Sequence, residues 1–141
     1  MKVRIIISII LALSSRVLFA QTSYPVLQTV HSTDYQTWEP VKTYMVISKL
    51  VVDDTAFKLY NGDKLIGAIS KGDCVVKKVS DRGIDYVSST NDNSMNIIVR
   101  MYLDDNYTYT PIMILLIYRT NPDDKTKVDY FRMNLDPGAV K

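Results

Sequence analysis

Short apolar runs alternate with turn-forming residues along the chain from residue 44 onward. The turns contain Asn-Gly, Lys-Gly-Asp, Asp-Arg-Gly and Asn-Pro-Asp-Asp, whose residues favour reversals of the chain direction. They recur about every ten residues, a spacing typical of small β-barrels and sandwiches. We therefore expect strands at residues 44–52, 56–60, 64–70, 74–79, 84–89, 95–103, 109–119 and 128–135.

Two of these segments have informative hydrophobic patterns. Residues 95–103 have an apolar side chain at every second position, which indicates a half-buried antiparallel strand. The apolar face comprises Met95, Ile97, Val99, Met101 and Leu103. Residues 112–117 are apolar at every position, so this strand is either central and covered on both sides or an interface between copies. We take Ile112, Ile114 and Leu116 as candidate interface residues.

No segment after residue 43 sustains the three-and-four spacing of an amphipathic helix. The sequence therefore predicts an all-β fold, a small antiparallel barrel or sandwich of seven to eight strands, in a single domain of residues 44–141. Residues 21–43 show no clean period, so we expect an extended lead-in that packs along the domain. Gly67 interrupts an expected strand and indicates a bend or a bulge.

The first 20 residues have the layout of a secretory signal peptide. Lys2 and Arg4 precede an apolar run at 5–13 that is too short to cross a bilayer, and Ala20 supplies a small residue for cleavage. A retained N-terminal anchor or an amphipathic surface helix is the alternative. Cleavage would leave residues 21–141 as a secreted or periplasmic protein without a membrane span.

Removal of this segment changes the charge of the protein. The whole chain has 17 basic and 15 acidic residues, a formal charge of +2. Lys2, Arg4 and Arg16 lie in the first 20 residues, and removing these three leaves 14 basic against 15 acidic residues, a charge of −1. Nucleic-acid binding requires a basic face, so a near-neutral protein gives no electrostatic reason to expect it.

Candidate catalytic and metal-binding residues are few. His31, the only histidine, lies next to Ser32 and near Asp34, but adjacent residues of an extended segment point to opposite sides, so we expect no catalytic triad. One histidine and one cysteine are too few for a typical zinc site. Cys74 has no second cysteine to pair with, and we expect a buried, unreactive thiol; a bridge to a partner is the alternative.

Acidic pairs mark three of the expected turns, at residues 53–54, 104–105 and 123–124. Aspartate at a strand end commonly accepts backbone hydrogen bonds in a turn. The spacing is not that of a calcium-binding loop, although two converging turns could bind calcium weakly. We therefore expect no enzymatic activity, no cofactor and no resident metal.

A further pattern lies between residues 56 and 89. It consists of Lys-Leu-Ile-Gly-Ala-Ile at 64–69, Lys-Gly-Asp at 71–73, an apolar-basic strand at 75–79, and Asp-Arg-Gly followed by Tyr86. This order resembles the bacterial SH3-like domain of exported and cell-wall-associated proteins, with Ile84 where that family usually has Trp. The resemblance implies a small barrel that binds a ligand and does not catalyse; other small barrels share much of this chemistry.

Tyrosine is abundant, with ten residues, all after the first 20. Tyr side chains suit stacking on sugars and contacts with proteins, although strands favour them for packing as well. Tyr60 and Tyr86 flank expected hairpins, and we take them as candidate ligand-binding residues. Asn106 begins a glycosylation sequon, which would matter only in a eukaryotic secretory pathway.

Taken with the export signal, these features favour a non-enzymatic exported binding module that recognises a protein or a cell-envelope polymer. One alternative is an inhibitor or immunity-type protein that blocks another protein. A second is a structural subunit of an envelope complex that self-assembles through residues 112–117.

Overall fold

The computed structural model describes residues 21–41, 47–119 and 127–137, and about two thirds of these residues belong to β-strands. The strands are β1 (Thr22–Ser32), β2 (Glu39–Pro40), β3 (Lys49–Val52), β4 (Ala56–Asn61), β5 (Lys64–Ser70), β6 (Val75–Lys78), β7 (Gly83–Ser89), β8 (Met95–Leu103), β9 (Tyr109–Arg119) and β10 (Val128–Leu135). A short 3-10 turn, η1 (Lys71–Asp73), joins β5 to β6. The prediction of an all-β fold is confirmed. The expected signal peptide, residues 1–20, lies outside the described residues.

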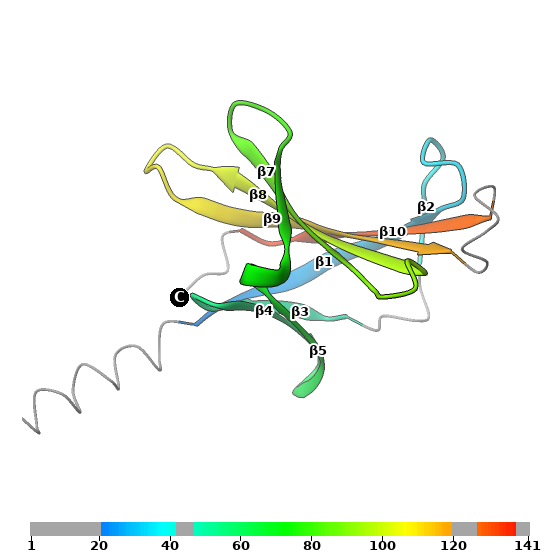
Figure 1. The fold of residues 1–141 in the computed structure, drawn as a ribbon, viewed down its shortest axis with the longest axis horizontal. Coiled ribbons are helices and arrows are strands. Elements are labelled where there is room, and N and C mark those ends of the chain that lie inside the picture. The colour runs from blue at the N-terminus through cyan, green and yellow to red at the C-terminus, as the bar shows by residue number, and fades with distance from the viewer. Residues whose placement is uncertain (1–20, 42–46, 120–126, 138–141) are drawn as a thin grey trace, which may run out of the picture.

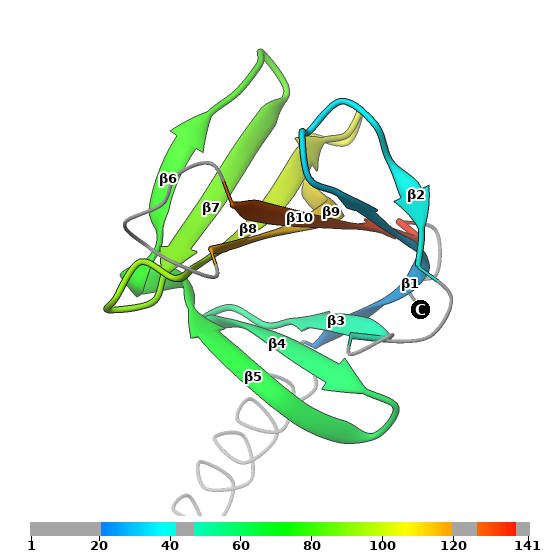
Figure 2. The same ribbon diagram turned by 90° about the vertical axis from the view of Figure 1, so that its right-hand side faces the viewer.

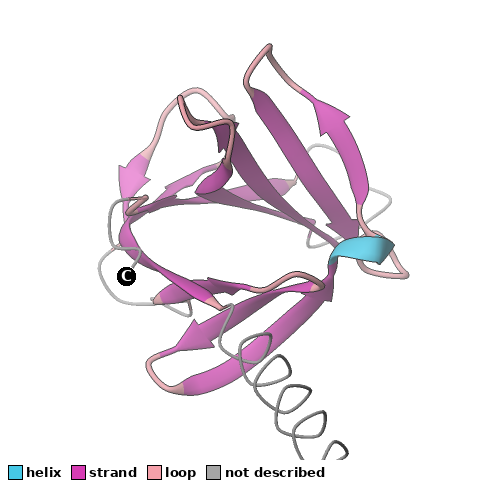
Figure 3. Ribbon diagram, turned by 90° about the vertical axis from the view of Figure 1, so that its left-hand side faces the viewer, coloured by secondary structure: helices cyan, strands magenta, loops and turns pink. Residues whose placement is uncertain are grey.

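The strands form one curled antiparallel sheet in the order β5-β4-β3-β1-β10-β9-β8-β7-β6, with β2 paired to β1 (Figure 1). Viewed from its two ends, the sheet has the cross-section of an open ring (Figures 2 and 3). One part of the ring holds β6–β10, the other holds β3–β5, and β1 belongs to both. In the described part of the chain no ladder joins the outermost strands β5 and β6, so the half-barrel is open between them.

Within residues 21–43, which were expected to form an extended lead-in, Thr22–Ser32 form β1 and Glu39–Pro40 form β2. The first residues of β1 pair with β3 and the later ones with β10, which makes β1 a central strand. A register shift between Val26 and Gln28 changes which alternate residues face the interior, and this explains why no clean period is visible in the sequence. With β1 and β2, the described residues contain ten strands, against seven to eight expected.

The hairpins that carry the SH3-like resemblance follow the turn chemistry of the sequence. Asn61 faces Lys64 across the β4–β5 turn, and Gly62 has a φ of +59°, which glycine adopts without steric cost. The register of the two strands shifts next to Gly67, which confirms the expected bulge. Within residues 56–89, the β4–β5 hairpin lies at one end of the sheet and the β6–β7 hairpin at the other.

Apolar side chains from both parts of the ring fill its interior. The core cluster comprises Tyr24, Ile47, Leu50, Phe57, Leu59, Ile69, Val99, Met101, Ile114, Met133 and Leu135. Of the β8 face predicted to be apolar, Val99 and Met101 belong to this core and Ile97 packs against it. The half-buried, alternating character of residues 95–103 is therefore confirmed.

The run of apolar residues at 112–117 lies in β9, which is a central strand between β8 and β10. Ile114 faces the core, and Leu115, on the opposite face, is also buried. The segment between β1 and β2 folds back over this outer face: the Tyr35 ring lies 5.1 Å from that of Tyr130, and the Trp38 ring lies 4.5 Å from the Arg132 guanidinium. Of the two explanations considered for this run, a central strand covered on both sides is the one observed.

Candidate functional site

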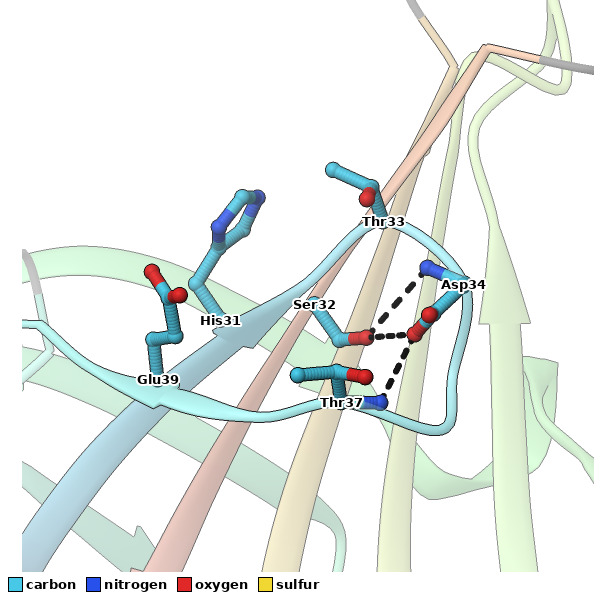
Figure 4. A pocket seen from close by; sticks show the side chains of 6 residues that line it. All are labelled: His31, Ser32, Thr33, Asp34, Thr37 and Glu39. Carbon is cyan, nitrogen blue, oxygen red and sulfur yellow. Dashed lines mark hydrogen bonds between the residues drawn. The ribbon is translucent and has the colours of Figure 1, made fainter.

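A polar hollow of about 160 Å³ lies where the chain turns from β1 into β2 (Figure 4). Its lining residues are His31, Ser32, Thr33, Asp34, Thr37 and Glu39. The three residues considered for a Ser-His-Asp triad all line this hollow, so their geometry decides which chemistry it can support.

Ser32 and Asp34 hold the turn that forms one wall of the hollow. The Ser32 hydroxyl donates to Asp34 Oδ1 at 2.9 Å and accepts the N–H of Tyr35 at 2.9 Å. The Asp34 carboxylate also accepts the N–H groups of Thr37 and Gln36, each at 2.8 Å. These backbone bonds, with the Ser32 hydroxyl, lower the pKa of Asp34 to about 2. Both side chains are therefore engaged in local structure.

His31 points away from Ser32 (Figure 4). Its Nε2 lies 2.8 Å from Asp129 Oδ1, and its ring packs 4.9 Å from that of Phe131. The expectation that these neighbours point to opposite sides is confirmed, and the imidazole does not contact the serine hydroxyl as a general base must. Among the residues that the structure describes, no group of three or more His, Cys, Asp or Glu is placed to hold a metal ion.

The structure separates the two tyrosines proposed to bind a ligand. Tyr86 packs against the core, with its ring edge-on to Phe57 at 5.1 Å. Tyr60 alternates with the buried Leu59 and so faces outward, where the Lys49 ammonium lies 5.1 Å from its ring. Since the two rings lie on opposite faces of the sheet, they do not form one binding surface.

Of the three candidate interface residues, Ile114 is the one whose burial argues against an interface role. Ile114 has 0% of its surface exposed, so its side chain cannot contact a second copy. Leu116 packs against the core, and Ile112 is the additional residue at a register shift, where Arg100 faces Met113 but Met101 faces Pro111. None of the three side chains is exposed, and Ile114 and Leu116 contribute to the core or pack against it.

Exposed apolar side chains gather instead on β6, at one end of the sheet. Val75 is 59% exposed, Val76 53% and Val79, just beyond the strand, 46%. All four residues of β6 are exposed, and within the described residues only β7 flanks the strand. This surface was not predicted from the sequence, although lysines beside valines in a short strand, as in Lys77 and Lys78, are a signal of a sheet edge.

The other end of the sheet, β5, differs from β6. Leu65 and Ile66 are exposed there, but the register shift beside Gly67 interrupts the strand. A bulge of this kind twists an edge away from a potential partner strand. The ladder of β6 with β7 has no such irregularity. Of the two edges, β6 is therefore the one open to pairing.

Cys74, which immediately precedes β6, is half-buried and was expected to be buried. Its Sγ donates to the Ser70 carbonyl at 3.4 Å. Burial raises the pKa of the thiol, and the negative charge of Asp73 raises it further. Both effects disfavour the thiolate, which is the reactive form.

Aspartates cap several turns, as the acidic pairs in the sequence suggested. Asp53 accepts the N–H groups of Thr55 and Ala56, and Asp104 accepts those of Asn106 and Thr108. The third pair, at residues 123–124, lies outside the described residues. Backbone hydrogen bonds lower the pKa of Asp53 to about 2. At Asp92, bonds from the backbone and side chain of Ser94 have the same effect.

Acid is expected to weaken the fold through these turns. Asp34, Asp53 and Asp92 have a pKa of about 2 in the folded chain against an ordinary value of 3.8. The unfolded chain therefore binds more protons, and the stability that these groups contribute is present above about pH 4 and lost as the pH falls towards 2. Chemical unfolding measured across this range should show a flatter pH dependence for the triple Asp→Asn variant.

The control for this measurement is Asp54→Asn, which removes an exposed carboxylate beside Asp53. It should change the pH dependence of unfolding less than the triple variant does, because Asp54 accepts none of the turn hydrogen bonds described for Asp34, Asp53 and Asp92. If the free energy of unfolding fell equally steeply between pH 4 and pH 2 for the wild type and the triple variant, the acid sensitivity would not come from these turns.

Comparison of the sequence with protein-family models gave no match, and searches of curated proteins and of solved structures gave none either. No helix in the described residues is both long enough and apolar enough to cross a membrane. What the protein does must therefore be argued from its own surface.

Proposed function

We propose that this chain is an exported, non-enzymatic binding module that recognises another protein through the β6 end of its sheet. The observation that supports this is the exposure of Val75, Val76 and Val79 on and just beyond β6, an edge strand that pairs only with β7 among the described residues. Exposed apolar side chains that gather at a sheet edge often mark sites of protein contact, and an apolar edge left uncovered is an aggregation hazard. A partner protein that covers β6 accounts for both.

Export is proposed from the sequence of residues 1–20, and the SH3-like character of residues 56–89 likewise stays a prediction. An inhibitor or immunity-type protein would use the same edge to block its target. A self-assembling subunit would pair β6 with a second copy. These alternatives differ in the partner and share the surface.

A cell-envelope polymer is a second candidate ligand, favoured by exposed tyrosines at the β8–β9 turn. Tyr102 is 42% exposed, Tyr107 85% and Tyr109 43%. Tyr107 has a φ of +58°, a left-handed conformation uncommon for such a residue, in a turn that Asp104 stabilises through backbone N–H groups. Tyrosine rings held in this way offer faces on which sugar rings can stack.

The two candidates are distinguished by retention experiments with the protein purified from cells that express the full chain. Immobilised protein is incubated with envelope extract, and free protein is sedimented with isolated cell-wall material. For a protein partner, we expect one stoichiometric protein to be retained, lost in Val75→Ser/Val76→Ser and kept in Tyr107→Ala. Wall binding that is lost only in Tyr107→Ala would support the polymer. Retention that neither variant changes would contradict both candidates.

A further inference from the structure

The backbone of β6 presents hydrogen-bonding groups to the open edge at defined positions. Val79 N–H donates to the Gly83 carbonyl at 2.9 Å, and residues bonded to the neighbouring strand alternate with residues that are not. Since β6 pairs with β7 without a register shift, Val75 and Lys77 bond to β7. The N–H and C=O groups of Val76 and Lys78 therefore point away from the sheet.

The pairing of β7 with β8 supports the same assignment. Leu103 N–H donates to the Arg82 carbonyl at 2.7 Å, which directs the even-numbered residues of β7 towards β8 and its odd-numbered residues towards β6. Among the residues that the structure describes, no hydrogen bond reaches the four outward groups of β6. An added antiparallel strand would satisfy all four.

The side chains of β6 define the chemistry of such a strand. Val76 lies on the same face as Tyr86, its cross-strand neighbour, and Val75 lies on the other face, so both faces present apolar surface. Lys77 and Lys78 are exposed, one on each face, and neither forms an ion pair within the described residues. A complementary strand is apolar opposite the valines and acidic opposite the lysines.

We infer that the partner contributes an extended segment, with acidic and apolar residues, that adds to β6 as a further antiparallel strand. This inference rests on the proposed function and names its ligand. Main-chain hydrogen bonds at Val76 and Lys78 supply affinity, and the side chains beside them supply specificity.

A second copy of β6 is a poorer occupant than an acidic segment. Three antiparallel registers join the outward groups of Val76 and Lys78 in both copies. In one of them Lys77 lies opposite Lys77 of the second copy, and in another Lys78 lies opposite Lys78. Like charges directly opposite each other destabilise a strand pair, and lysines on natural edge strands oppose such self-association.

The probe for the test is the fluorescent peptide acetyl-Thr-Ile-Glu-Glu-Val-Val-Thr-amide. In antiparallel register its glutamates face Lys78 and Lys77, and its valines face Val76 and Val75. A control peptide has lysine in place of both glutamates. We expect saturable binding of the acidic peptide that weakens with added salt. The lysine peptide should bind the wild-type protein about tenfold more weakly, and the acidic peptide should bind Lys77→Glu/Lys78→Glu about tenfold more weakly.

Backbone pairing is tested by Val76→Pro, with Val76→Thr as its matched control. Proline removes the outward N–H but no hydrogen bond to β7, so an edge strand tolerates it. Threonine keeps the N–H and the branched shape. We expect proline to abolish peptide binding and threonine to preserve it. Circular dichroism confirms that both variants are folded.

Hydrogen exchange provides a second measurement of backbone pairing. Exchange of the Lys78 amide should slow on peptide binding, while exchange of the Lys77 amide, which is already bonded to β7, should change little.

The outcomes separate the inference from the proposed function. Binding of the peptide that survives Val76→Pro, or equal binding of the acidic and lysine peptides, would overturn strand addition by an acidic segment. The proposed function would still stand if Val75→Ser/Val76→Ser abolished retention of an envelope protein. A dimer in analytical ultracentrifugation that Val76→Pro dissociates would show that a second copy is the occupant, against the inference.

Discussion

Replacement of Phe57 with alanine is expected to lower the free energy of unfolding by about 3–5 kcal/mol. Phe57 lies on β4 with 0% of its surface exposed, and Tyr86 lies on β7, in the other part of the ring. Their rings pack edge-on with centroids 5.1 Å apart, and the Lys71 ammonium lies 5.3 Å from the Phe57 ring. No strand pairing joins β5 to β6 in the described residues, so this aromatic contact holds the two parts together on the open side.

Leu65→Ala is the matched control, because Leu65 lies in the same β4–β5 hairpin but is 50% exposed. Its effect on the free energy of unfolding should be about 0.5 kcal/mol or less. Urea or guanidinium unfolding followed by circular dichroism measures both variants. Similar losses of stability for Phe57→Ala and Leu65→Ala would show that the contact between the two parts is not as described.

The second large effect is expected from Asp85→Ala, with a loss of about 1.5–3 kcal/mol. Asp85 is buried, and both of its carboxylate oxygens accept hydrogen bonds from Arg100, at 2.8 Å from Nε and 2.9 Å from a terminal nitrogen. The hydrogen bond to Asp85 raises the pKa of the Arg100 guanidinium. Removing the carboxylate leaves a half-buried cation without its partner, and the 34% exposure of the Arg100 side chain limits the cost.

The ion pair of Arg82 with Asp105 provides the control, since its nitrogen and oxygen are also 2.8 Å apart but the Asp105 side chain is 94% exposed. Asp105→Ala should cause no detectable change in unfolding by denaturant, because water screens this pair. A double variant, Asp85→Leu with Arg100→Met, should recover much of the loss caused by Asp85→Ala, as expected when a buried pair is replaced by apolar groups. A loss for Asp105→Ala equal to that for Asp85→Ala would refute the role assigned to burial.

The candidate site shows where reasoning from the sequence stops. The alternation of neighbouring side chains along a strand was sufficient to separate His31 from Ser32, but the partner of His31 is Asp129, 98 positions further along the chain. Tyr60 and Tyr86 lie in the hairpins at the two ends of the sheet. The sequence does not show which face of each hairpin is turned towards the core. Only the curl of the sheet, which brings Phe57 against Tyr86, turns Tyr86 inward.

The sequence by itself determined the all-β class and the approximate positions of β3–β10, together with the bulge at Gly67. These features depend on turn chemistry and on the alternation of side chains, which act over a few neighbouring residues. The central place of β1, the exposure of β6 and the burial of Ile114 were decided by the tertiary structure. Each depends on which distant strand lies alongside, and that is settled by the burial of apolar surface over the whole sheet.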